Sequence, residues 1–277
     1  MNLPRVSVGI PVYNGEKFLK KALTSIVYQS HKNIEIIVSN NCSTDNSLEI
    51  INNFKSIDNR IILHNQKKKL SMMDNFRFVL DKSNSNYFMW AACDDFRSRN
   101  FIKKNLEFLE NNKDFVASIS PVRFFHYEYN TKKIGDYTLD DQTVYKRINK
   151  GLKLNANSRF YSLFRSNQLK TFRYIDNNYL GDDFPYIIHM LIKGKFKNIG
   201  EGSLILSKSG MSNRKDIFKN YQESFIDLIL PFNKLLKNSL IISNSIKLKF
   251  LIFIKILKFN FDANILRFKW LILKIIR

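Results

Sequence analysis

The first part of the chain alternates short apolar runs with longer segments in which apolar residues recur every three or four positions. The apolar runs at residues 6–11, 34–38, 61–63 and 87–92 have the length of β-strands. The recurring spacing between them predicts helices, for example over residues 72–80. Strands that alternate with helices indicate a parallel sheet with helices on both faces, joined by right-handed crossovers.

Beyond residue 95 the predicted elements are shorter and less regular. A helix is predicted at residues 100–110, strands at 115–120 and 122–129, and a polar loop region at 130–157. A strand at 159–164, a helix at 182–193 and two closing strands at 196–199 and 204–207 follow. Together with the first part they predict one α/β domain over residues 1–210.

The character of the chain changes after Gly210, the last glycine, where Ile, Leu, Phe and Lys become dense. This predicts a helical segment over residues 211–277. On a helical wheel one narrow arc is polar: Lys247, Lys255, Lys258, Asp262 and Lys269. Two interpretations are open. The segment is either a basic amphipathic helix on an anionic membrane surface, or a helical cap on the sheet domain or on a second subunit.

Composition narrows the class of partner only in part. The net charge is +21, from 45 Lys and Arg against 24 Asp and Glu, which favours anionic partners such as nucleic acid, a membrane or phosphorylated substrates. Codon bias toward Lys and Asn is an equally good explanation of the excess. Because the basic residues are spread along the chain and no nucleic-acid-binding motif occurs, nucleic acid is not the expected partner.

The cysteines and the N-terminus predict a cytoplasmic location. Cys42 and Cys93 are the only two cysteines, which fits a reducing compartment. The opening residues lead into a strand without the pattern of a signal peptide, and no run of 18 apolar residues lacks a charge. With the basic tail, this predicts a peripheral protein on the inner face of the cytoplasmic membrane.

Two adjacent carboxylates, Asp94 and Asp95, follow the apolar run at residues 87–92. Ligands of open α/β sheets bind just beyond the carboxyl ends of strands. Two carboxylates at such a place, in so basic a chain, predict a divalent cation that bridges the protein to a diphosphate. The competing interpretation is an aspartate that caps the following helix.

Four motifs in this order resemble glycosyltransferase family 2, a group of nucleotide-sugar-dependent enzymes of the GT-A fold. The first is an opening strand with its donor loop at residues 7–16, and the second is the second-strand motif at 35–45. The third is a metal-binding DxD region at 87–95, and the fourth is a Glu-Asp motif before a helix at 180–183. The resemblance covers about residues 6–212. It implies a mixed, mostly parallel sheet of the GT-A (Rossmann-like) type with helices on both faces.

The resemblance also implies roles for individual residues. Asp95, helped by Asp94, would bind Mn²⁺ or Mg²⁺, and Asp183 would be the general base, with Asp182 orienting the acceptor. An acid pair at a helix start is alternatively only a favourable partner of the helix dipole. The residues that would contact the donor are Pro11, Tyr13, Asn14, Glu16, Asn40, Asn75 and Asp94, with Tyr13 along the base.

The implied reaction is inverting transfer of a single sugar from a nucleotide-diphosphate sugar, UDP being the family default. The acceptor would be a hydroxyl of a lipid-linked or cell-surface glycan, such as a lipopolysaccharide O-antigen or a capsule. The QxxRW signature of processive synthases is absent, which argues for single transfer. Two positions depart from the family pattern, Asn40 for the usual acid and Ala92 for the first aspartate of DxD. They leave open a catalytically inactive, membrane-tethering subunit, and the basic charge leaves a nucleic-acid-binding protein as a further alternative.

Overall fold

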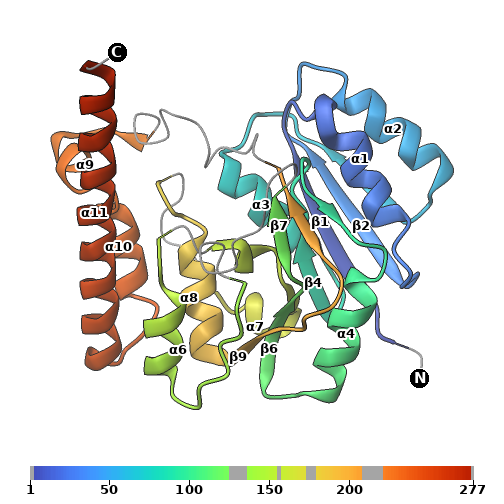
Figure 1. Cartoon of the computed structure of the whole chain (residues 1–277). Coiled ribbons are helices and arrows are strands. Elements are labelled where there is room, and N and C mark those ends of the chain that lie inside the picture. The colour runs from blue at the N-terminus through green and yellow to red at the C-terminus, as the bar shows by residue number, and fades with distance from the viewer. Residues whose placement is uncertain (1–2, 125–135, 155–156, 173–178, 208–220, 276–277) are drawn as a thin grey trace.

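The computed structural model describes residues 3–124, 136–154, 157–172, 179–207 and 221–275 (Figure 1). A seven-stranded sheet crosses the molecule in the order β3-β2-β1-β4-β8-β6-β9. Neighbouring strands are parallel except that β8 runs antiparallel to both β4 and β6. The strands are β1 (Val6–Val12), β2 (Ile34–Asn40), β3 (Ile61–Asn65), β4 (Tyr87–Trp90), β6 (Phe115–Ile119), β8 (Leu163–Arg165) and β9 (Lys195–Asn198). The prediction of a mixed, mostly parallel sheet is confirmed.

A second, small sheet begins with the short strand that follows β4 in the chain. Its order is β5 (Phe96–Arg97), β10 (Leu204–Leu206) and β7 (Val122–Phe124). β10 is antiparallel to β5 and parallel to β7. This sheet holds the backbone directly after Asp94 and Asp95.

Helices cover both faces of the large sheet, because the strands bury side chains on both sides. One face packs against α1 (Glu16–Val27), α2 (Ser47–Ile57) and α4 (Phe101–Asn111). The other packs against a larger group: α3 (Met72–Asp81), α6 (Val144–Gly151), α8 (Phe184–Lys193), α10 (Asn233–Leu240) and α11 (Ile246–Ile275). The short helices are η1 (Asn157–Tyr161), α7 (Ser166–Leu169) and α9 (Phe225–Ile229).

Two predicted elements differ from the structure. The strand expected at 159–164 is a 3-10 turn, η1, followed by the short β8, because the Phe160 ring stacks on Trp90 and this packing overrides the local strand preference. The region 130–157, predicted as a polar loop, contains the helix α6. The buried side of this helix includes Arg147, so its sequence is polar even at a buried position. Residues 125–135 lie outside the described part, so the strand predicted at 122–129 is observed only to Phe124.

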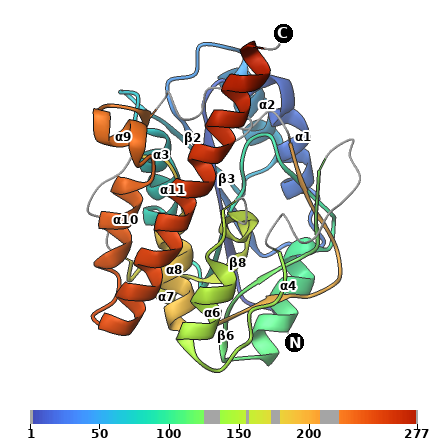
Figure 2. The ribbon, with the colours of Figure 1, turned by 60° about the vertical axis from the view of Figure 1, so that its left-hand side comes forward.

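The C-terminal helices share a core with the sheet domain (Figure 2). Phe259 of α11 packs on Phe184 of α8, with ring centroids 5.3 Å apart, and on Phe232 at 5.7 Å. The Phe232 amide donates to the Asn260 side chain at 2.8 Å. α11 therefore caps the domain. The boundary predicted at residue 210 stays a prediction, since residues 208–220 are not described. Among the described helices, none has the length and apolar character needed to span a membrane.

Gly9 of β1 lies directly under α3 and provides a stability prediction. A Cβ at this position would be 2.6 Å from Val79 Cγ2 and 2.8 Å from Phe88 Cζ. We expect Gly9→Ala to lower the free energy of unfolding by about 1–3 kcal/mol, because two buried side chains must shift. Urea unfolding followed by circular dichroism measures this. Ser56→Ala, on the exposed side of α2, is the matched control and should change little; an equal effect of both variants would contradict the close packing at Gly9.

Candidate active site

The parallel strands β1, β2 and β4 end at the same edge of the sheet, so the loops that follow them lie together. The loop after β1 is bound to the loop after β2. Asn14 Oδ1 accepts from the Thr44 amide at 2.9 Å, and Glu16 Oε2 accepts from the Asn46 amide at 3.0 Å. Asn14 has a left-handed backbone, φ 49°, which asparagine tolerates better than most residues. Asn14 and Glu16 thus shape the loop with their side chains.

Pro11 and Tyr13 differ in exposure, although they are two residues apart. Pro11 is buried within β1, where it lies opposite Ser39 of β2. The Tyr13 side chain is 43% exposed, and the Lys69 ammonium lies 3.9 Å from its ring centroid. Tyr13 therefore offers an aromatic surface beside a cation, a combination suited to a nucleotide.

Asn40 and Asn75 lie at the same edge, but their amides are engaged in the interior. Asn40 Nδ2 donates to Asn65 Oδ1 at 2.7 Å, and its Oδ1 accepts from the Ser43 amide at 3.3 Å. Asn75 accepts from the Ser39 hydroxyl at 2.6 Å and donates to the Ser39 carbonyl. Both residues are buried. They fix the loops around Tyr13, and a direct contact with the donor stays a prediction.

The Tyr13 loop and the acid pair meet at Cys93. A Cβ at Gly15 would be 3.1 Å from the Cys93 sulfur, so this loop lies against the end of β4. Burial, with the charges of Asp94 and Asp95, raises the pKa of the Cys93 thiol to about 12. The thiol is therefore neutral at physiological pH, and the site brings the predicted donor loop next to both carboxylates.

Asp95 is a buried carboxylate with a perturbed pKa. Burial and then the neighbouring charge of Asp94 raise its pKa to about 7, while the Ser207 amide, 2.9 Å from Oδ1, favours the charged form. Arg97 lies close enough to act on it electrostatically, and its Nη2 donates to the Trp90 carbonyl at 2.6 Å. Arg97 Nε and Nη1 are buried and have no hydrogen-bond partner in the described part of the chain.

The acid pair fits a divalent cation. Two neighbouring carboxylates, one of them with a pKa raised by burial and by the charge of the other, gain stability when a dication neutralises them. Within the described ranges, no group of three or more His, Cys, Asp or Glu residues could hold a metal. Among the described residues, Asp94 and Asp95 would supply the carboxylates, and diphosphate oxygens and water would add further ligands, as is usual for Mg²⁺.

An aromatic cluster joins the end of β4 to the start of α8. The Trp90 and Phe160 rings stack with centroids 4.2 Å apart, and Tyr186 lies 5.2 Å from Trp90 and 5.9 Å from Phe160. These rings come from β4, η1 and α8. Because they are packed together, residues within four positions of them in sequence, including Asp94, Tyr161 and Asp183, are held in one region.

Asp183 stands at the N-terminus of α8, but its side chain makes no capping hydrogen bond. Burial raises its pKa to about 6, and the nearby Asn157 side chain partly opposes that shift. The tight turn before it requires Gly181, whose φ is 82°. Asp182, the other predicted catalytic residue, is buried beside it. A carboxylate of this pKa can accept a proton near neutral pH.

One tyrosine lies near acids of both pairs, and a second tyrosine lies by the later pair. The charges of Asp95, Asp94 and Asp183 all act on the Tyr161 phenol, whose pKa burial raises well above its ordinary value. Tyr221 lies by the second pair, where burial and then Asp182 and Asp183 raise its pKa to about 12. The structure therefore brings Asp94, Asp95 and Asp183 to one site.

Four residues of this site were not predicted from the sequence: Arg97, Asn157, Tyr161 and Tyr221. A signal existed only for Arg97, a basic residue two positions after the acid pair. The others stand in segments without a recognisable motif, and only the tertiary packing of η1 and of the C-terminal part brings them to the acids.

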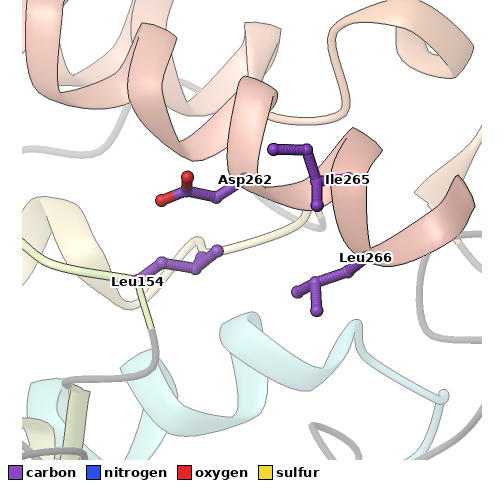
Figure 3. Close-up of a pocket in the computed structure, with 4 residues that line it drawn as sticks. All are labelled: Leu154, Asp262, Ile265 and Leu266. Atoms are coloured by element: carbon purple, nitrogen blue, oxygen red, sulfur yellow. The ribbon is translucent and has the colours of Figure 1, made fainter. Parts of the chain in front are cut away.

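A pocket of about 280 Å³ opens between α11 and the segment before η1 (Figure 3). Leu154, Asp262, Ile265 and Leu266 line it. Leu154 precedes Asn157 by three residues, and Phe259, one turn before Asp262, packs on the residue after Asp183. The pocket is therefore on the Asp183 side of the site, and it combines apolar walls with one carboxylate.

Comparison with known families gives one match over more than half of the chain. Residues 7–173 match the model of Glycosyl transferase family 2. This span includes Asp94 and Asp95 and ends before Asp182 and Asp183. The assignment of the second acid pair therefore rests on the geometry described above.

Relatives with known sequences carry the same description. An uncharacterized glycosyltransferase of Haemophilus influenzae is 35% identical over 112 residues, 40% of this chain and 45% of that protein. Glycosyltransferase GlyA of Streptococcus pneumoniae is 25% identical over 78% of this chain and 29% of that protein. The putative teichuronic acid biosynthesis glycosyltransferase TuaG of Bacillus subtilis is 28% identical over 38% of this chain and 42% of that protein. The match spans less than half the length of each.

Solved structures share the fold at low identity. TarS 1-349 of S. aureus in complex with UDP-GlcNAc has a TM-score of 0.61 and 13% identity over 94% of this chain and 81% of that chain. The mannosyltransferase PcManGT of Pyrobaculum calidifontis in complex with GDP-Man and Mn²⁺ has a TM-score of 0.59 and 13% identity, over 93% of this chain and 70% of that chain. These likenesses confirm the predicted fold class.

Proposed function

Because the chain belongs to glycosyl transferase family 2, we propose that it transfers a single sugar, with inversion, from a nucleotide-diphosphate sugar to an acceptor hydroxyl. The observation that carries this proposal is the approach of Asp94, Asp95 and Asp183 to Tyr161, since it combines a diphosphate site and a base of suitable pKa in one place. The family membership makes the chain a glycosyltransferase; the stereochemistry, metal and acceptor are the proposed part.

The donor would lie across the loops after β1, β2 and β4. Tyr13 would stack on the base, and Asp94 would reach the ribose, the sugar or the diphosphate. Mn²⁺ or Mg²⁺ bound at Asp95 and Asp94 would neutralise charge on the departing diphosphate. Arg97, with two buried N–H groups unpartnered within the described residues, adds positive charge behind Asp95. A nucleotide-diphosphate sugar as donor is supported by the fold shared with TarS, which was solved with UDP-GlcNAc, and with PcManGT, which was solved with GDP-Man. UDP is the nucleotide that we propose.

The chemical step needs one proton acceptor. Asp183 would take the proton of the acceptor hydroxyl as its oxygen attacks the anomeric carbon. The new glycosidic bond forms as the bond from sugar to phosphate breaks, and the nucleoside diphosphate leaves with that electron pair. Attack from the face opposite the leaving group inverts the anomeric centre. Asp182, buried beside the base, would orient the acceptor.

The acceptor is proposed to be a cell-surface or lipid-linked glycan. Support comes from the relative TuaG, whose description is teichuronic acid biosynthesis. The pocket of Leu154, Asp262, Ile265 and Leu266 lies on the Asp183 side, and its mixed lining suits a sugar bearing an apolar group.

A donor screen tests the proposal. The protein is incubated with UDP-, GDP- and dTDP-sugars, each with Mn²⁺ or Mg²⁺, and release of the nucleoside diphosphate is measured with and without glycan acceptors. We expect slow hydrolysis of one donor class that depends on metal. Thermal-shift measurements on the same mixtures detect binding independently. An intact fold that binds none of the donors would overturn the proposal and favour an inactive, tethering subunit.

Tyr13→Ala should weaken donor binding about tenfold, since base stacking on an aromatic side chain contributes about 1–3 kcal/mol. Isothermal titration with the nucleoside diphosphate measures this. Tyr28→Ala is the matched control, because Tyr28 is 64% exposed at the other end of α1 and should leave affinity unchanged. Equal affinities for wild type and Tyr13→Ala would exclude Tyr13 from the base site.

A further inference from the structure

The helix α11 has two apolar faces, and within the described residues one of them packs against the domain while the other is exposed. Its inner face carries Ile252, Phe259 and Ala263, which are buried against the domain. At about 100° per residue, a second row of apolar side chains points almost the opposite way. This outer stripe consists of Ile246, Phe250, Ile254, Leu257, Phe261 and Phe268, all exposed.

The outer stripe is long and continuous. It extends over 23 residues from Ile246 to Phe268, or about 33 Å for the 22 steps between them at 1.5 Å each. Phe250, Phe261 and Phe268 are each 66% exposed. α11 runs along one side of the molecule (Figures 1 and 2). An apolar surface of this size on a folded protein marks an interaction site.

α9 extends the apolar surface. It is fastened to α11 by hydrogen bonds from Asn264 to the Ile229 carbonyl, 2.8 Å, and from Arg267 to the Leu228 carbonyl, 2.5 Å. Its residues Phe225 and Ile226 are also exposed. The apolar surface therefore continues beyond α11 onto the neighbouring helix.

Cations border the stripe on both sides. On the helical wheel, Lys249 and Arg267 lie along one edge, and Lys247 and Lys258 lie along the other. The thirty residues of α11 include seven basic residues and a single acid, Asp262, which lies away from the stripe and lines the pocket. Apolar residues between two rows of cations are the pattern of a helix that lies in a membrane interface.

We propose that α11, extended by α9, docks this protein on an anionic lipid bilayer through the outer stripe. The charges favour a bilayer over a second copy, because pairing two such helices would bring their cations together. The phenylalanines enter the acyl boundary while the flanking cations contact the headgroups. On this proposal the same helix caps the domain with one face and anchors the protein with the other.

Docking would also orient the site. Phe259 on the inner face packs on Phe184, which follows Asp183, so the anchor is one layer of side chains from the proposed base. An acceptor held in the same bilayer would then approach from the pocket at α11. This last consequence rests on the proposed function; the docking itself does not.

Cosedimentation of the full chain with vesicles tests the docking. We expect binding to vesicles of phosphatidylglycerol and phosphatidylcholine, weaker binding at high salt, and little binding to phosphatidylcholine alone. Phe250→Asp with Phe261→Asp should reduce the partition coefficient more than tenfold. Lys249→Ser with Lys258→Ser should reduce it about 25-fold, at about fivefold for each cation.

Ile57→Asp is the matched control, since Ile57 is 79% exposed on α2, on another side of the molecule, and should leave binding unchanged. The charge variant carries the test if the Phe variant does not fold. The proposal is overturned if both variants bind vesicles like wild type. It is also overturned if wild type ignores vesicles and forms a dimer that Phe250→Asp dissociates, since a second copy then covers the stripe.

Discussion

Replacing Asp183 by Asn is expected to lower the turnover number about 10³-fold, within the range of about 10²–10⁴ that a positioned general base contributes. Asparagine has the same shape but cannot accept the proton of the acceptor hydroxyl. Donor affinity should be unchanged, because the donor loops lie at the ends of β1, β2 and β4. Steady-state kinetics with donor and acceptor, and calorimetry with the nucleoside diphosphate, separate these two effects.

The pH profile gives the same prediction a second readout. The pKa of Asp183 is raised to about 6, and the base acts only when ionised. The wild-type turnover number should therefore rise about tenfold per pH unit below pH 6 and level off above it. The residual activity of Asp183→Asn should lack this limb. Asp114→Asn, at an exposed ion pair with Lys195, is the control and should keep the wild-type profile.

The same substitution should stabilise the protein. The pKa of Asp183 in the folded state, about 6, is above its ordinary value of 3.8. The folded state therefore binds the proton more tightly than the unfolded state does. The stability that this group contributes is lost as pH rises from about 4 to 6. At pH 7 the neutral Asn should raise the free energy of unfolding by about 3 kcal/mol. Urea unfolding should show this gain at pH 7 and little at pH 4. An inactive variant that is less stable at pH 7 would indicate a structural role instead.

Much of the sheet follows from local pattern. β1, β2 and β4 are rich in apolar residues because parallel strands covered on both faces have no solvent side. The places of Tyr13 and of the first acid pair follow from the rule that ligands bind beyond strand ends. These features depend on a few consecutive residues, which is why the sequence suffices for them.

The local sequence pattern does not predict that the two acid pairs lie in one site. It depends on Trp90, Phe160 and Tyr186, which are far apart in sequence and packed together in space. The same packing replaced the expected strand at 159–164 by η1. Likewise, the wheel of α11 shows one polar arc, but which apolar face is inner and which is outer depends on the partner helices α8 and α10. Long-range packing decides each of these.

The surroundings of Asp95 fit two roles, a structural ion pair or a metal site, and a substitution distinguishes them. Asp95 accepts from the Ser207 amide and lies near Arg97, so it could serve only to neutralise a buried arginine. That role would not require Asp94 beside it, whose charge raises the pKa of Asp95 and makes the pair costly without a cation. Crowded carboxylates are instead expected where a dication and a diphosphate complete the site.

Asp95→Asn should therefore lower kcat/KM about 10³-fold, since charge stabilisation at a departing diphosphate contributes several kcal/mol. Asparagine keeps the contact with Ser207, so secondary structure by circular dichroism should be that of wild type. Mn²⁺ affinity in the presence of nucleoside diphosphate should fall in titration calorimetry, and Asp114→Asn should change neither quantity. If Asp95 only neutralised Arg97, the variant would unfold more easily because a buried cation loses its counter-charge, yet its Mn²⁺ affinity would be that of wild type. Loss of metal affinity with an intact fold therefore distinguishes the diphosphate site from a structural ion pair.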